Sequence, residues 1–166
     1  MKSPVAKFHS LLLASALLGL TPQTFGQPTT VLSSTLVTLT MRGYELPRAE
    51  AAELLSHLPA AANAKELLFL AGGIVSQGRG KIVKLPTLSM NSGGSDKGYD
   101  GPLLSEAQAT LNVDGSSAVI FFSMNSGPRQ IHSVLVAPVK GVALVGTFDE
   151  SSTGNVTLIF MRTTTE

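Results

Sequence analysis

The sequence contains no cysteine and no tryptophan, and charged residues make up only 14% of the chain. Without cysteine, the chain has no disulfide framework, no thiol chemistry and no zinc–cysteine site, so burial and hydrogen bonding must hold it together. The hydrophobic share of 43% is too high for a disordered polyelectrolyte and predicts a compact fold. A chain of 166 residues has room for one domain of this kind.

An excess of charge of either sign is also missing. Without Lys2 and Lys7 of the N-terminal segment, 10 Lys and Arg face 11 Asp and Glu, a formal net charge of −1. Proteins that bind nucleic acid usually combine a basic patch with aromatic residues for stacking, whereas this chain has 2 Tyr and 7 Phe. The composition therefore argues against nucleic acid as a partner.

The first 26 residues have the three parts of a secretory signal peptide. Residues 1–9 contain two lysines and no acid, residues 10–20 form an apolar run, and residues 21–26 bring a proline and then small residues. The apolar run is too short to cross a bilayer, which needs about 20 residues. We predict cleavage before Gln27, no integral membrane span after cleavage, and a single strand-rich domain over residues 27–166. The mature protein is expected to be periplasmic or secreted, with outer-membrane association as a further alternative.

Periodicity predicts one strand and two short helices in the first part of the mature chain. Apolar and polar residues alternate within residues 31–44, which is typical of a half-buried strand. Pro47 opens a helical stretch over residues 48–58, and a second helix with a broad apolar face is predicted over residues 63–76.

From residue 81 onward, β-branched and aliphatic runs alternate with turn residues. Six strands are predicted there, over residues 81–90, 107–113, 118–124, 131–136, 142–148 and 156–162. Short separators favour hairpins and an antiparallel meander, and the longest irregular stretch is residues 91–102. The predicted fold class is α+β: an antiparallel β-sheet of about six to seven strands, with two short helices packed on one side.

No arrangement of residues in the sequence demands a particular reaction. After the leader the histidines are His57 and His132, and neither has a second ligand three or four residues away. The glycine-rich segment over residues 73–80 has Arg79 where a phosphate-binding loop needs lysine. We therefore expect no catalytic residue, no metal ligand and no cofactor.

Residues 91–102 carry the candidate binding residues. Two carboxylates favour calcium, but Lys97 lies between them and the spacing does not fit an EF-hand loop. The aromatic ring at position 99 offers a stacking platform for a small ligand or a glycan. The candidate binding loop consists of Asn91, Asp96, Tyr99 and Asp100.

Three segments in the second half follow the motif order of a known family. Residues 80–93 run from a glycine through a strand, a proline and a further strand into a glycine turn. Residues 107–123 place two strands around Asp114-Gly115, and residues 142–161 close the pattern with two more strands. Over about residues 67–162 the chain resembles the secretin domain of type II and type III secretion proteins. A true secretin is much longer, with ring-forming periplasmic domains ahead of its barrel, so the resemblance implies a soluble secretin-like module and not a pore.

Two functions from different classes follow. The first is a non-enzymatic envelope protein whose sheet serves protein–protein interaction, in or beside a secretin-type assembly. Its partners would be envelope or secretion-system proteins, or further copies of the same chain. The alternative is a small-ligand or glycan binding module that uses residues 91–102.

Overall fold

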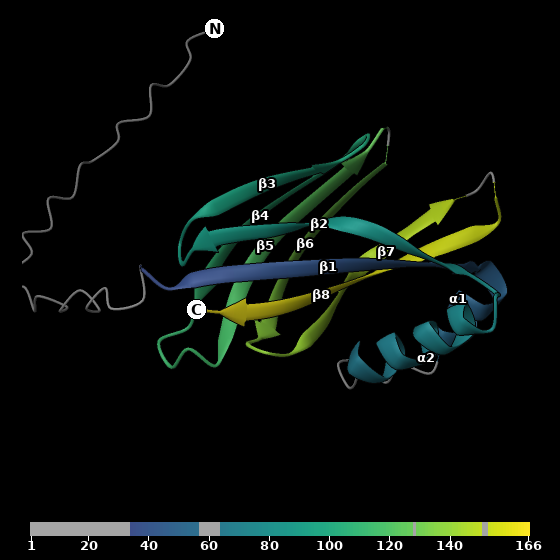
Figure 1. Ribbon diagram of the computed structural model, residues 1–166, viewed down its shortest axis with the longest axis horizontal. Helices are drawn as coiled ribbons and strands as arrows, with labels where there is room; N and C mark the ends of the chain where they lie inside the picture. Colours follow the sequence, from purple (N-terminus) through teal and green to yellow (C-terminus); the bar gives the residue numbers. More distant parts are fainter. Residues whose placement is uncertain (1–33, 57–63, 128, 151–152) are drawn as a thin grey trace, which may run out of the picture.

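The computed structural model describes residues 34–56, 64–127, 129–150 and 153–166. These residues contain eight strands and two helices in the order β1, α1, α2, β2 to β8 (Figure 1). The helices are α1 (Arg48–Ser56) and α2 (Ala64–Ser76). The strands are β1 (Leu36–Pro47), β2 (Lys81–Asn91), β3 (Ser95–Asp100), β4 (Leu103–Leu111), β5 (Ser117–Ser126), β6 (Arg129–Pro138), β7 (Val142–Glu150) and β8 (Asn155–Thr165).

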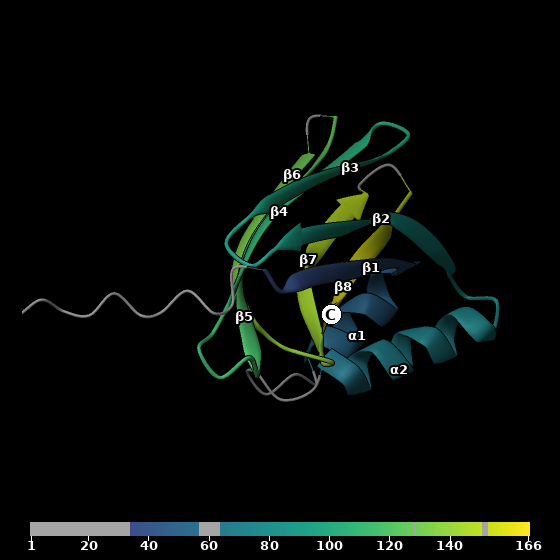
Figure 2. The ribbon, with the colours of Figure 1, turned by 60° about the vertical axis from the view of Figure 1, so that its left-hand side comes forward.

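The strands form two antiparallel sheets of four, in the orders β2-β1-β8-β7 and β3-β4-β5-β6. Figure 2 shows them as two facing layers, with the helices beside the layer that holds β1 and β8. The chain passes between the layers at the β2–β3 and β6–β7 turns. At the first of these, Gly93 adopts a φ of 85°, which favours glycine, and its N–H donates to the carbonyl of Ala109 at 2.7 Å. This bond ties the turn to β4.

The main hydrophobic core lies between the two sheets and follows the period-two pattern of the strands. Val37, Leu39 and Met41 of β1 point inward, as do Ile120 and Phe122 of β5, and all five are at most 3% exposed. Each such side chain contributes about 1.5–3 kcal/mol on burial. The sandwich is therefore held together mainly by apolar contacts between its layers.

A second core lies on the outer side of the first sheet, where both helices pack. Tyr44 of β1 and Phe160 of β8 meet there edge to face, with ring centroids 5.8 Å apart. Ala51 and Leu54 of α1 and Leu67 and Ala71 of α2 cover this surface. Because the side chains of β1 point alternately to the two sides of the sheet, this strand contributes residues to both cores.

The prediction of an antiparallel α+β fold with two helices on one side is confirmed in outline. The expected single sheet of six to seven strands is wrong, because the strands form two sheets and number eight in the described residues. The additional strand is β3, which lies in the stretch that was expected to be irregular. The predicted leader and its cleavage site lie outside the described residues, as does His57.

Neither of the two described helices is long and apolar enough to cross a membrane.

Candidate functional site

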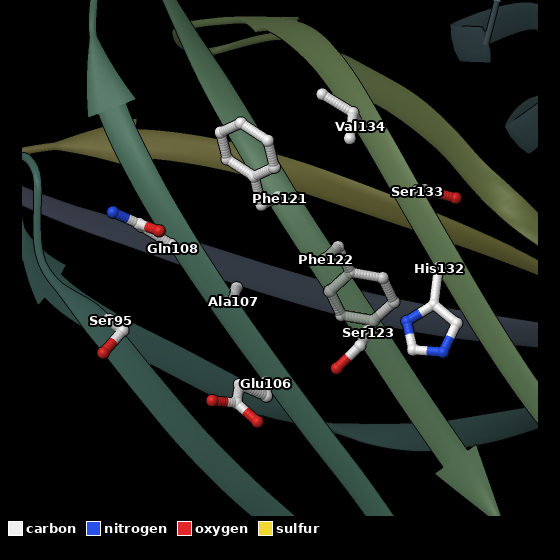
Figure 3. Close-up of a pocket in the computed structure, with 10 residues that line it drawn as sticks. All are labelled: Ser95, Glu106, Ala107, Gln108, Phe121, Phe122, Ser123, His132, Ser133 and Val134. Carbon is white, nitrogen blue, oxygen red and sulfur yellow. The ribbon is translucent and has the colours of Figure 1, made fainter.

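The outward side of the β3–β6 sheet, here termed the open face, lies away from both helices (Figure 2). The strand register aligns its side chains in rows that run across the strands. The first row contains Ser95, Gln108, Phe121 and Val134, and the second contains Lys97, Glu106, Ser123 and His132. A third row brings Thr110, Val119 and Val136 together. Residues of the first two rows line a shallow depression of about 470 Å³ (Figure 3).

One end of the open face is apolar. Phe121 is 52% exposed, Val134 68% and Val136 64%, and they lie on the neighbouring strands β5 and β6. Val119, which pairs with Val136, extends the same patch. A soluble monomer normally exposes such side chains singly, so a contiguous group points to a contact surface.

The other end of the open face is polar. The ammonium of Lys97 lies 3.2 Å from a carboxylate oxygen of Glu106, across neighbouring strands. Ser123 lies between Glu106 and His132 in its row (Figure 3). In a serine nucleophile site the histidine stands between the serine and the acid, whereas here the serine occupies the middle. The ring of His132 contacts the side-chain oxygen of Gln130 at 3.4 Å, so this row does not have the geometry of a catalytic triad.

A second depression lies between the two sheets. Its lining residues belong to the end of the sandwich where β1 leads into α1, and Figure 1 shows where these two elements meet. This α1-end cavity measures about 480 Å³, within the range of small-ligand sites. Its apolar lining includes Leu103, Met124, Phe148 and Ile159. Polar residues that reach it include Glu45, Lys81, Asp100 and Thr157.

Glu45 is a buried charged residue in the lining of the α1-end cavity. It is 7% exposed, and its carboxylate accepts hydrogen bonds from Nζ of Lys81 at 2.9 Å and from Nδ2 of Asn155 at 2.8 Å. Burial raises the pKa of this carboxyl, but the two hydrogen bonds and the charge of Lys81 outweigh burial and hold the pKa below its ordinary value of 4.5. Glu45 is therefore ionised at neutral pH and anchors the end of β1.

The predicted binding residues are only partly brought together. Asn91 is exposed at the end of β2, while Asp96 accepts hydrogen bonds from the backbone N–H groups of Ser89 and Lys97, both at 2.8 Å. These bonds give the Asp96 carboxylate a local structural role. Tyr99 is 72% exposed on β3, and Asp100 lies at the rim of the α1-end cavity.

Comparisons with known proteins add no relative. No family model matches the chain, and searches of curated proteins and of solved structures also found no match. Within the described residues, no group of three or more histidine, aspartate or glutamate side chains is placed to hold a metal ion.

Sequence reasoning missed both depressions. The alternation in residues 118–124 predicts that Phe121 and Phe122 point to opposite sides, and Phe122 is indeed 3% exposed against 52% for Phe121. The pattern does not say which side another element covers. A residue such as Glu45, which reads as the polar end of a strand, likewise gives no sign that it enters a cavity.

Proposed function

We propose that the protein is an exported, non-enzymatic envelope protein that works by protein–protein assembly through the open face. The resemblance of residues 67–162 to a secretin domain suggests the setting, an assembly of the secretion type. The observation that carries the proposal is the unequal covering of the two sheets. Tyr44 and Phe160 on the outer side of the first sheet are buried under helices, whereas Phe121, Val134 and Val136 on the open face have no cover among the described residues.

The occupant that best fits the open face is a second copy of this chain. The four strands have 6, 9, 10 and 10 residues, and at a spacing of about 4.8 Å and a rise of about 3.3 Å per residue they present about 550 Å². Two copies would then bury about 1,100 Å², at the low end for a specific interface. Sheets stack face to face at about 10 Å, which suits the short side chains of Val134 and Val136.

The charges of the open face also favour self-association. Lys97 and Glu106 already pair with each other, so a second copy would meet little net charge. An isologous contact about a twofold axis would place the apolar ends of the open faces of both copies against each other. Because the buried area is small, the expected dimer is weak and its population depends on concentration.

The test is sedimentation of the mature protein from about 1 μM to 1 mM, where weak dimers form. The wild-type protein is expected to shift from monomer to dimer across this range. Val134→Lys places two like charges near the twofold axis and should leave the protein monomeric. Val113→Lys is the matched control, because Val113 is 89% exposed in the turn between β4 and β5, outside the open face.

Two results would overturn the proposal. One is a wild-type protein that stays monomeric throughout the range. The other is a Val134→Lys protein that dimerises as well as the Val113→Lys control. Circular dichroism must first show that both variants keep the wild-type strand content.

A second candidate function is small-ligand binding in the α1-end cavity. It is favoured by the Glu45 carboxylate, which is 7% exposed and lies in the lining of the cavity beside apolar side chains such as Leu103 and Phe148. Asp100, one of the four predicted binding residues, also lines this cavity.

The ligand hypothesis is tested with anilinonaphthalene sulfonate, whose fluorescence rises in apolar sites. Leu103→Trp should fill the cavity and reduce dye binding at least tenfold, whereas Leu104→Trp, on the outward side of the same strand, should not. Equal binding to both variants would rule out the cavity as the site. Deleting residues 92–101 is not a usable test, because it would remove β3.

A further inference from the structure

Three cationic side chains lie together on the outer side of the first sheet. Arg42 of β1 is opposite Lys84 of β2 in the register, and Arg162 of β8 is opposite Thr40 of β1, the outward residue next to Arg42. All three cations are exposed, and they come from three adjacent strands. They are distant in the sequence, so only the sheet brings them into one patch.

The cations of this patch have no acidic partner among the residues that the structure describes. None of the three makes an ion pair or a hydrogen bond within the described part of the chain, and the outward positions in their two rows carry no acid on β1, β2, β7 or β8. Elsewhere in the described residues, an acid pairs with each of four cations: Arg48, Arg79, Lys81 and Lys97. In a mature chain of formal net charge −1, three unpaired cations side by side create a local positive field.

An apolar pocket of about 210 Å³ adjoins the two arginines. Arg42, Arg162 and Thr40 line it together with Tyr44, Phe160 and Val142 of the sheet and Leu68 of α2. The edge-to-face contact of Tyr44 and Phe160 fixes one wall, so the pocket exists before any ligand arrives. Guanidinium groups at the rim of an apolar pocket match a ligand with an anionic group on an apolar body.

We propose that this patch is a binding site for a small anionic amphiphile, whose phosphate, sulfate or carboxylate group is held by Arg42 and Arg162. Lys84 adds charge on the open side, and the Thr40 hydroxyl is placed to donate a further hydrogen bond. The apolar part of the ligand enters the pocket between α2 and the sheet. The site is on the opposite side of the sandwich from the open face, so it does not depend on the proposed assembly.

The experiment is a titration of the mature, isotope-labelled protein with hexyl phosphate, followed by nuclear magnetic resonance. Inorganic phosphate and hexanol serve as the two halves of the ligand. Hexyl phosphate is expected to shift the signals of β1, β8 and α2 and to bind at least tenfold more tightly than either half. Arg42→Gln and Arg162→Gln should each weaken binding at least fivefold, and added salt should weaken it further. Arg48→Gln, which removes one charge at the start of α1, is the matched control and should bind as the wild type does.

The proposal is overturned if hexyl phosphate binds no better than inorganic phosphate, or if Arg48→Gln weakens binding as much as Arg42→Gln.

A second titration uses vesicles of phosphatidylcholine containing phosphatidic acid, and it distinguishes a lipid headgroup from a free metabolite as the source of the anionic group. The ligand is a lipid headgroup if the protein binds both hexyl phosphate and these vesicles, and if Arg42→Gln loses the vesicle binding. Hexyl phosphate binding without vesicle binding identifies a free metabolite. Vesicle binding without hexyl phosphate binding refutes the pocket.

Discussion

Phe121 and Phe122 are neighbours on β5, yet alanine substitution should affect them very differently. Phe122 is 3% exposed in the core between the sheets, whereas Phe121 is 52% exposed on the open face. Successive side chains of a strand point to opposite sides, so the two positions share the same backbone and the same chemistry. They differ only in what surrounds the ring.

The magnitude follows from burial. Removing a buried phenylalanine ring leaves a cavity, and Phe122→Ala is expected to lower the free energy of unfolding by about 3–5 kcal/mol. Phe121 keeps about half of its surface in water, so Phe121→Ala forfeits about half of a transfer free energy of 1.5–3 kcal/mol and leaves no cavity. The expected difference between the variants is at least about 1.5 kcal/mol.

The assay is urea unfolding of residues 27–166, the part after the predicted leader, monitored by far-ultraviolet circular dichroism. It is run at a concentration at which the wild type is monomeric, so that association does not add to stability. The slope of the transition should stay unchanged, which shows that both variants unfold from a native state of similar compactness. The sedimentation experiment on the same two proteins should give the reverse order, with Phe121→Ala losing self-association.

The reasoning is refuted if the two variants are equally stable, or if Phe121→Ala is the less stable one. A shift of β5 by one residue would exchange the two rings and produce that reversed order. The experiment therefore tests the register of β5 in the second sheet directly.

Three further predictions concern other parts of the fold. Because the folded-state pKa of Glu45 is lowered, the stabilising contribution of its carboxylate is present at neutral pH and is lost as pH falls below 4.5. Glu45→Gln should therefore be less stable than the wild type at pH 7, and the difference between their urea midpoints should narrow in acid. Gly98→Ala should destabilise by about 1–3 kcal/mol, because its new Cβ would lie 2.5 Å from Cβ of Pro86, and thermal unfolding would show this as a lower Tm. Arg48→Ala removes an ion pair whose side chains are more than half exposed, and the free energy of unfolding should change by less than about 1 kcal/mol.

Most strands could be predicted from their alternation of apolar and polar residues, and the helices from their helix-forming residues, with Pro47 directly before the first. The polar segment of β3 could not, since residues 95–100 contain no β-branched residue and read as a turn-rich loop. This segment becomes a strand because a hydrogen bond from Gly93 to Ala109 ties the β2–β3 turn to β4, and residues 95–100 then pair with the backbone of β4. Pro86 is tolerated in β2 because that strand lies at the edge of its sheet, beside a register shift.

The division into two sheets was equally hidden. A single sheet covered by helices needs strands with one apolar side, and so do two sheets that face each other. Period-two patterning therefore cannot distinguish these two architectures. Strand β1 illustrates the difficulty, because Met41 faces the core between the sheets while Tyr44 faces the helices. Which surface an apolar residue meets is decided by packing between layers.

By itself, the sequence determined the local elements, the lack of cross-links and the near-neutral charge, because these depend on residue type and spacing along the chain. Only the tertiary structure decided which apolar side chains stay uncovered on the open face and which cations gather around Arg42. Both features join residues from strands that are remote in sequence, and the register of hydrogen bonds between strands is what places them side by side.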